Sequence, residues 1–389
     1  MSAQPGHPPG GLALSAVDID AAAKRIAGVV TPTPLQLCDR LSAVTGATVY
    51  LKREDLQSVR SYKLRGAYNL LVQLSEDEIA AGVVCSSAGN HAQGFAYACR
   101  MLGIRGRVYV PAKTPKQKRD QIRYHGGEFI ELIVGGATYD AAAEAALADV
   151  VRTGATLVPP YDDTRVIAGQ GTIATEILAQ LDTEPDLVVV PVGGGGCIAG
   201  ITTYLAERSE HTSVLGVEPA GAAAMMAALA AGELVTLDHV DQFVDGAAVK
   251  RAGTLTYAAL AAAGDMVSVT TVDEGAVCTA MLDLYHNEGI IAEPAGALSV
   301  AGLLEAGPDI FTAGSTVVCL ISGGNNDVSR YGEILERSLV HLGLKHYFLV
   351  DFPQEPGALR GFLDEVLGAN DDITLFEYVK RNNRETGEA

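Results

Sequence analysis

The sequence predicts an open α/β fold in two lobes, in which a parallel sheet carries helices on both faces. Continuous runs of Val, Ile and Leu recur along the chain, as expected for strands that are buried on both sides. Ala-rich segments with helical spacing separate these runs, and glycine-rich stretches follow several of them. Ligands of such sheets bind beyond the carboxyl ends of the strands, so we expect the functional site there.

Charge and composition exclude several classes of protein. The chain has 389 residues, with 47 acidic and 28 basic side chains and a net charge of -19. This acidic balance disfavours nucleic acid and anionic membranes as partners. The sequence lacks an apolar run long enough to span a bilayer and a signal peptide, so we expect a cytoplasmic protein. Its six cysteines form no CxxC pair, which predicts reduced thiols and no metal site.

The predicted strands and helices alternate in chain order. The strands are Thr48–Lys52, Gly82–Ser86, Arg107–Val110, Leu187–Val192, Val214–Val217, Met266–Thr270 and Thr316–Ile321. The clearest helices between them are Asn90–Leu102, Tyr139–Val151 and Ile167–Gln180. This alternation is typical of a doubly wound sheet.

The end of the chain has a different pattern. His346–Asp351 and Ile373–Val379 alternate as strands, and Glu355–Leu367 between them has helical spacing with Pro356 near its start. Three elements bury little surface alone, so we expect this β-α-β unit to pack on another part of the protein.

A lysine stands where a helix is predicted to begin, in the segment Ser61–Gly66. Ser61 is a suitable N-cap. The helix dipole and partial burial would both lower the pKa of Lys63, making its amine nucleophilic and able to form a Schiff base. The alternative is a solvated surface lysine, which is the commoner outcome for a lysine considered alone.

A second motif follows the strand at Gly82–Ser86. It consists of Ser86, Ser87, Ala88, Gly89, Asn90 and His91. Successive backbone N–H groups at the start of the next helix can hold a carboxylate. So many small and polar residues exceed what a capped turn needs, which favours a binding loop.

Four consecutive glycines, Gly193, Gly194, Gly195 and Gly196, lie between a strand and a helix. They let a phosphate group approach the backbone closely, and the helix N-terminus adds positive potential. No Lys-Ser/Thr pair follows, and the spacing differs from a dinucleotide fingerprint, although Glu218 lies at a suitable distance for one.

The fourth motif begins with Ser322, directly after the strand Thr316–Ile321. Its hydroxyl can hydrogen-bond a heterocyclic nitrogen. Taken alone, the segment is better explained as an ordinary turn.

In this order, the four motifs closely resemble the fold-type II pyridoxal-phosphate (PLP) enzymes, and among them the threonine ammonia-lyases, or threonine dehydratases, of the biosynthetic type. The resemblance runs from about Ile26 to the C-terminus and includes Asp245–Lys250 and Ala292–Ala297. It implies a catalytic domain over residues 1–340, with a smaller lobe at about 55–160 inserted in the larger one. A partial ACT-like regulatory unit follows over residues 341–389.

The resemblance also implies roles. Lys63 carries the cofactor as a Schiff base and removes the α-proton of the substrate. Asn90 contacts the ring hydroxyl of the cofactor, and Ser322 its ring nitrogen. Gly193 to Gly196 hold the phosphate, and the loop from Ser86 to His91 binds the substrate.

The implied reaction is the PLP-dependent dehydration and deamination of L-threonine to 2-oxobutanoate and ammonia, the first step of isoleucine biosynthesis, with L-serine as a weaker substrate. A lysine amine beside Cα can act as the base, and the PLP ring can delocalise the resulting charge. The alternatives are a catabolic serine/threonine dehydratase, an NAD(P)-binding dehydrogenase that uses the glycines, and a non-catalytic amino-acid sensor.

Two positions differ from the related serine racemases. Ala88 stands where those enzymes place a serine on the opposite face of the substrate, so we expect no racemisation. Ala224 stands where an acidic ligand of a divalent cation is expected, so we expect no divalent site. Glu218 with backbone carbonyls could hold a monovalent cation, or could be a solvated turn carboxylate.

The resemblance further implies a homotetramer and feedback control by isoleucine, with valine as a second candidate effector. The tail is about half of one regulatory module and lacks its final strands, so feedback control here is a hypothesis for assay.

Overall fold

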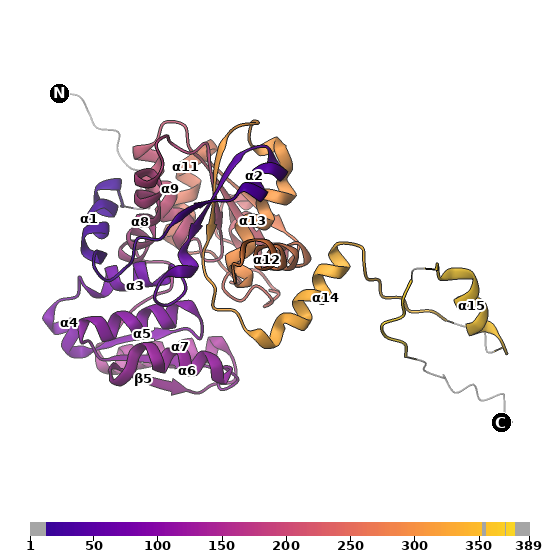
Figure 1. Cartoon of the computed structure of the whole chain (residues 1–389). Coiled ribbons are helices and arrows are strands. Elements are labelled where there is room, and N and C mark those ends of the chain that lie inside the picture. The colour runs from indigo at the N-terminus through magenta and orange to yellow at the C-terminus, as the bar shows by residue number, and fades with distance from the viewer. Residues whose placement is uncertain (1–12, 352–354, 370, 378–389) are drawn as a thin grey trace. The chain divides into compact units, whose positions relative to one another are not determined.

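Two sheets organise the chain in the computed structural model, which describes residues 13–351, 355–369 and 371–377 (Figure 1). The larger sheet has the order β1-β2-β10-β7-β8-β9 and the smaller one β5-β4-β3-β6. All paired strands are parallel except β1, which runs antiparallel to β2 at one edge. The strands are β1 (Leu35–Leu37), β2 (Thr48–Arg53), β3 (Val83–Ser86), β4 (Gly106–Val110), β5 (Ile130–Val134), β6 (Thr156–Leu157), β7 (Leu187–Pro191), β8 (Ser213–Pro219), β9 (Val267–Val272) and β10 (Thr316–Ile321).

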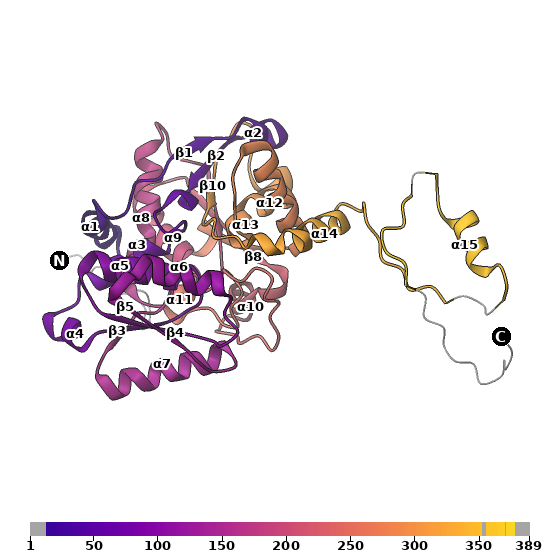
Figure 2. The same cartoon turned by 60° about the horizontal axis from the view of Figure 1, so that its bottom comes forward.

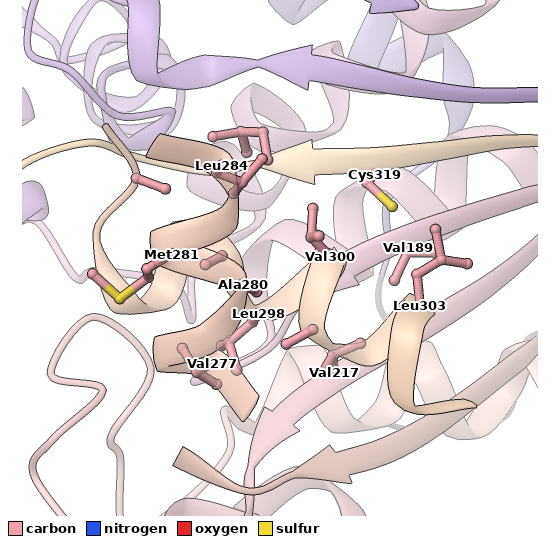
Figure 3. Close-up of a cluster of buried hydrophobic side chains, with 14 of the residues drawn as sticks. Val189, Val217, Val277, Ala280, Met281, Leu284, Leu298, Val300, Leu303 and Cys319 are labelled. Carbon is pink, nitrogen blue, oxygen red and sulfur yellow. The ribbon is translucent and has the colours of Figure 1, made fainter. Parts of the chain in front are cut away.

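Helices cover both faces of the larger sheet. Along β7, Val188 and Val190 pack into one apolar cluster and Val189 into another, because successive side chains point to opposite faces. Figure 3 shows the second cluster, where Val189 and Cys319 of the strands lie beside Leu303. The helices of this lobe are α1 (Ala16–Ile26), α2 (Asp39–Thr45), α8 (Thr164–Gln180), α9 (Gly196–Arg208), α10 (Ala224–Ala231), α11 (Thr254–Ala263), α12 (Glu274–Glu288), α13 (Pro294–Ala306) and α14 (Tyr331–His341).

The smaller sheet lies between its own helices. Figure 2 shows its strands with α7 on one side and with α5 and α6 on the other. Val83 and Cys85 pack into the cluster that contains α5, whereas Val84 packs into the cluster that contains α7. The helices of this lobe are α3 (Lys63–Leu71), α4 (Glu76–Ala81), α5 (Asn90–Leu102), α6 (Lys116–Gly126) and α7 (Tyr139–Thr153).

The predicted fold class and all seven predicted strands of the two lobes are confirmed. Three further strands, β1, β5 and β6, were not predicted, because they are short or carry a charged residue such as Glu131 within the run. The predicted N-cap of α3 is wrong. Tyr62 precedes the helix, while the fully buried Ser61 forms an isolated bridge with Gly323.

The chain divides into one unit over residues 1–345 and another over 346–389. In the second unit the predicted helix forms as α15 (Ala358–Val366), after Gly357 at φ 94°. The prediction of strands is wrong for 346–351 and for 373–377, where no strand is present, and the rest of Ile373–Val379 lies outside the described residues. Extended segments need a paired neighbour to satisfy their backbone groups, and the described residues supply none here.

Among the residues that the structure describes, no helix is long and apolar enough to cross a membrane.

Candidate active site

The four predicted motifs meet beyond the carboxyl ends of the strands. The Tyr62 amide donates to the Ser322 carbonyl at 3.1 Å, which joins the start of α3 to the end of β10. The Asn325 side chain donates to Asn90 Oδ1 at 2.8 Å, which joins the same β10 loop to α5. These contacts bring Lys63, Asn90 and Ser322 to one place, although long stretches of sequence separate them.

Lys63 is the first residue of α3 and is half-buried. Its Nζ donates to the Pro160 carbonyl at 3.1 Å and lies 5.2 Å from the centre of the Tyr62 ring. Burial lowers the pKa of Lys63 to about 8, although Cys197 and Glu293 act in the opposite direction. The amine is therefore much more often neutral near pH 7 than a solvated lysine, which is what a nucleophile needs.

The loop from Ser86 to His91 has polar atoms to offer a ligand. The Ser86 hydroxyl and His91 Nδ1 are buried and have no hydrogen-bond partner among the described residues. His91 Nε2 lies 2.9 Å from the Val158 carbonyl. Burial, followed by the positive charge of Lys63, lowers the pKa of His91 to about 4, so the ring is neutral at pH 7. Ser87 Oγ accepts from the Gly89 amide at 3.3 Å, which shapes the turn before α5.

The four glycines are packed from behind by residues of the larger lobe and by Tyr161. A Cβ at Gly193 would lie 2.8 Å from the Ala247 Cα, and one at Gly194 would lie 2.3 Å from the Tyr161 ring. Gly195 has φ 90°, which other residues rarely adopt. Gly196 opens the 13-residue helix α9, whose first N–H groups and dipole favour an anion.

Ser322 lies directly after β10 and is buried. Its hydroxyl donates to the Ala295 carbonyl at 3.2 Å, so its oxygen keeps lone pairs with which to accept a further hydrogen bond.

Glu218 has a structural partner that the sequence did not reveal. It is fully buried, so the interpretation as a solvated turn carboxylate is wrong. Its two carboxylate oxygens accept from the Met225 and Met226 amides, each at 2.8 Å, at the start of α10. Burial raises the pKa of Glu218 to about 7, although the hydrogen bonds from these two amides act to lower it. The described part of the chain contains no group of three or more His, Cys, Asp or Glu placed to hold a metal ion, and a monovalent cation at Glu218 stays a prediction.

Glu293, Asn325 and Tyr161 received no role from the sequence. Glu293 is the N-cap residue of α13, and its Oε1 accepts a short hydrogen bond from Asn90 Nδ2. The sequence marked Glu293 only by its place in the Ala292–Ala297 motif. Its hydrogen-bond partner, Asn90, lies 203 residues away in the chain, so the contact could not be predicted.

The family models match almost the whole chain. The model described as "Pyridoxal-phosphate dependent enzyme" matches residues 26–323, and the model of the C-terminal regulatory domain of threonine dehydratase matches residues 336–389. A biosynthetic L-threonine dehydratase of Mycobacterium tuberculosis, strain H37Rv, is 85% identical over 376 residues, which are 97% of this chain and 87% of that protein. The chain belongs to the biosynthetic threonine dehydratases, within the pyridoxal-phosphate-dependent enzymes.

Two solved structures share the fold of this chain. The processed threonine deaminase isoform 2 of Solanum lycopersicum has a TM-score of 0.78 at 36% identity, covering 86% of this chain and 99% of that one. The maize serine racemase has a TM-score of 0.76 at 30% identity, covering 85% of this chain and 99% of that one. One of these proteins is named a deaminase and the other a racemase, and these are the two activities that Ala88 was predicted to distinguish.

The residues present fit PLP, the cofactor of the family. A half-buried lysine with a lowered pKa can bind its aldehyde carbon. The close packing behind Gly193 and Gly194 leaves a loop of backbone at a helix N-terminus for its phosphate. The Ser322 hydroxyl and the Asn90 amide supply polar groups for a ring.

Proposed function

We propose that this threonine dehydratase converts L-threonine to 2-oxobutanoate and ammonia, with L-serine as a weaker substrate, and that Lys63 is both the cofactor-binding and the proton-removing residue. The observation that carries the proposal is the half-buried Lys63 amine, whose pKa of about 8 lies far below that of a solvated lysine. An amine that is neutral near the working pH can attack a carbonyl carbon and later accept a proton from Cα.

Each remaining group has a defined task. PLP, when bound, withdraws electrons from the substrate Cα. Gly193 to Gly196 hold the phosphate at the start of α9. The Ser86–His91 loop receives the substrate carboxylate, for which the Ser86 hydroxyl is available. Ser322 contacts the ring nitrogen by turning its one hydroxyl hydrogen from the Ala295 carbonyl to that nitrogen, and a hydroxyl does not keep the nitrogen protonated as a carboxylate would.

Ala88 supports dehydration without racemisation. Its methyl side chain is half-buried against the apolar cluster of the smaller lobe and cannot carry a proton. Inversion at Cα requires a proton donor on the face opposite the Lys63 amine, and Ala88 supplies none. We expect no detectable D-allo-threonine from L-threonine and no D-serine from L-serine when the products are analysed on a chiral column.

Borohydride trapping followed by mass spectrometry of peptides tests the central assignment. We expect the reduced cofactor on Lys63, and we expect Lys63→Ala to release no ammonia above background. Lys116→Ala is the control, since Lys116 is exposed and forms an ion pair with the exposed Asp120. Label on another residue, or turnover by Lys63→Ala, would contradict the role. A protein that binds NAD(P) and ignores PLP would support the dehydrogenase alternative.

The alternative function within the same family is that of a catabolic or serine-preferring dehydratase. The extra methyl group of threonine contributes about 1–3 kcal/mol in a fitted pocket. We therefore expect kcat/KM for threonine to exceed that for serine by at least tenfold, and the reverse order would support the alternative.

Regulation and assembly complete the proposal. The match of residues 336–389 to a regulatory domain supports isoleucine and valine as effectors, and activity measured with each of them decides it. If neither amino acid changes the activity, the proposal of feedback control is wrong. A protein that binds them but has no activity would support the amino-acid-sensor alternative.

We propose that the catalytic domain ends near residue 340 and that the protein is a homotetramer, which light scattering tests. The six free, buried cysteines support a cytoplasmic location.

A further inference from the structure

The Asn90 side chain is fixed by hydrogen bonds at both ends. Its Oδ1 accepts from Asn325 Nδ2 at 2.8 Å, and its Nδ2 donates to Glu293 Oε1. Asn325 Nδ2 also donates to the Val59 carbonyl at 2.8 Å, so both of its hydrogens are used and the nitrogen faces Asn90. This pattern determines which end of the Asn90 amide is oxygen and which is nitrogen.

One hydrogen of the Asn90 amide is left for a ligand. Nδ2 has two hydrogens, and Glu293 accepts one of them. Asn90 can therefore offer the site one N–H donor, while its carbonyl oxygen is directed toward Asn325. A donor is what a negatively charged oxygen on an aromatic ring requires.

Glu293 is held in place for this task. It is buried at the start of α13, and a Cβ at Gly323 would lie 2.3 Å from Glu293 Oε1, so the glycine gives the carboxylate its room. The charged and titratable groups around it are Asp245, Lys118, Lys63 and Tyr62. Burial, then the charge of Asp245, raises the pKa of Glu293 to about 7, while Asn90 and Lys118 lower it.

We propose that Glu293 is a positioning residue of the dehydratase, which acts through Asn90 by turning its amide nitrogen toward the ring oxygen of the cofactor. The inference rests on the proposed function, since it takes the cofactor to lie beside Asn90. A carboxylate accepts a hydrogen bond more strongly than a carboxylic acid does, so protonation of Glu293 below about pH 7 weakens the hold on Asn90.

Two substitutions at the same position separate the hydrogen bond from the charge. Glu293→Gln keeps an acceptor oxygen for Asn90 Nδ2, so we expect kcat within about threefold of wild type and no inflection near pH 7 in its acid limb. Glu293→Ala leaves the half-buried Asn90 amide without the acceptor that orients it, so we expect kcat to fall about 10- to 100-fold. The absorbance maximum of the bound cofactor should shift in Glu293→Ala and not in Glu293→Gln.

Glu274→Gln is the matched control. Glu274 is a buried carboxylate of the same lobe, but its Oε1 accepts from the Gly221 amide and not from Asn90. We expect this variant to keep the inflection near pH 7. In the double variant Glu293→Ala/Asn90→Ala, the two losses should not add, because both act through one amide.

Several results would overturn the inference. These are a wild-type spectrum and kcat in Glu293→Ala, a loss in Glu293→Gln equal to that in Glu293→Ala, or additive losses in the double variant. If wild type binds PLP without consuming threonine, the proposed function is wrong, but the absorbance spectra of the Glu293 variants still test the positioning role of Glu293. If wild type binds no PLP, both fail.

Discussion

Lys63 illustrates how a single side chain receives its chemistry from its surroundings. Burial lowers the pKa of its amine, and Glu293 and Cys197 limit how far it falls. The result is a pKa of about 8, which keeps an appreciable neutral fraction at neutral pH and a protonated form for later use.

A pH dependence follows for the apoenzyme. The neutral fraction of Lys63 rises about tenfold per pH unit up to about 8 and then levels off. We expect the rate at which added PLP is captured to follow the same curve, measured by stopped-flow absorbance. Because the folded pKa lies below that of a free lysine, Lys63 lowers the stability of the apoenzyme as the pH falls from about 10.5 to about 8, and this cost stays constant at lower pH. A capture rate that still rises steeply from pH 9 to pH 10 would contradict the role given to burial.

Gly194 gives a second prediction at this scale. A Cβ there would lie 2.3 Å from the Tyr161 ring, and overpacking of this kind is destabilising by about 1–3 kcal/mol. We expect Gly194→Ala to weaken PLP binding about tenfold or more, as measured by fluorescence titration. Gly332→Ala is the control, because Gly332 is exposed within α14 and a Cβ there meets nothing within 4 Å. If the two variants bound PLP with equal affinity, the close packing of Tyr161 behind Gly194 would not be needed for PLP binding.

At the scale of elements, a buried group of ion pairs holds the start of α3. Arg65 is fully buried and pairs with Glu54 through two hydrogen bonds of 2.7 and 2.8 Å. It also donates to Glu176 at 2.7 Å, and Glu176 accepts from the buried Lys52 at 2.6 Å. The network joins β2, α3 and α8, so it fixes the helix turn that carries Lys63.

Breaking this network should destabilise the fold strongly. Arg65→Met leaves Glu54 buried without its cation, and such changes destabilise proteins by about 3–5 kcal/mol. We expect a lower urea midpoint for Arg65→Met and partial recovery in Arg65→Met/Glu54→Met, which removes both charges. Lys116→Met serves as the control, because that lysine is exposed and its pair with Asp120 is too, so its midpoint should stay at the wild-type value. An unchanged urea midpoint in Arg65→Met would contradict this prediction and would indicate that water solvates the Glu54 carboxylate in place of Arg65.

The same scale shows what a sequence can predict. β10 was predicted to the residue, since a run of apolar side chains buried on both faces has a clear pattern. β6 has two residues and offered no pattern. The partners of Asn90 were not predictable, because hydrogen bonds between Asn90, Glu293 and Asn325 join segments that are more than 200 residues apart. Local patterns identify elements and binding loops, whereas the side chains that orient them come from tertiary contacts.

Within the first unit, one loop links distant parts of the structure. Lys118 of α6 pairs with Asp245, and Ala247 packs against Gly193 of the glycine loop. The same loop carries Phe243, whose ring centre lies 4.6 Å from the Arg330 guanidinium and 4.2 Å from that of Arg337 in α14. The regulatory-domain match begins at residue 336, inside α14, so the second half of this helix lies within the regulatory match while the whole helix belongs to the first unit.

A prediction about regulation follows from that position. Phe243→Leu keeps an apolar side chain but removes both cation–π contacts, each of which contributes about 0.5–1 kcal/mol. An effector signal that passes through α14 should lose the combined contribution of the two contacts, about 1–2 kcal/mol of coupling free energy, so we expect the isoleucine effect on the KM for threonine to fall about five- to thirtyfold. Activity without isoleucine should stay near wild type, because the cation–π contacts of the Phe243 ring are with Arg330 and Arg337, to which no cofactor or substrate role is assigned. Phe311→Leu makes the same change at another position of the same apolar cluster and should leave the isoleucine effect intact. An undiminished isoleucine effect in Phe243→Leu would mean that the signal reaches the glycine loop without using this ring.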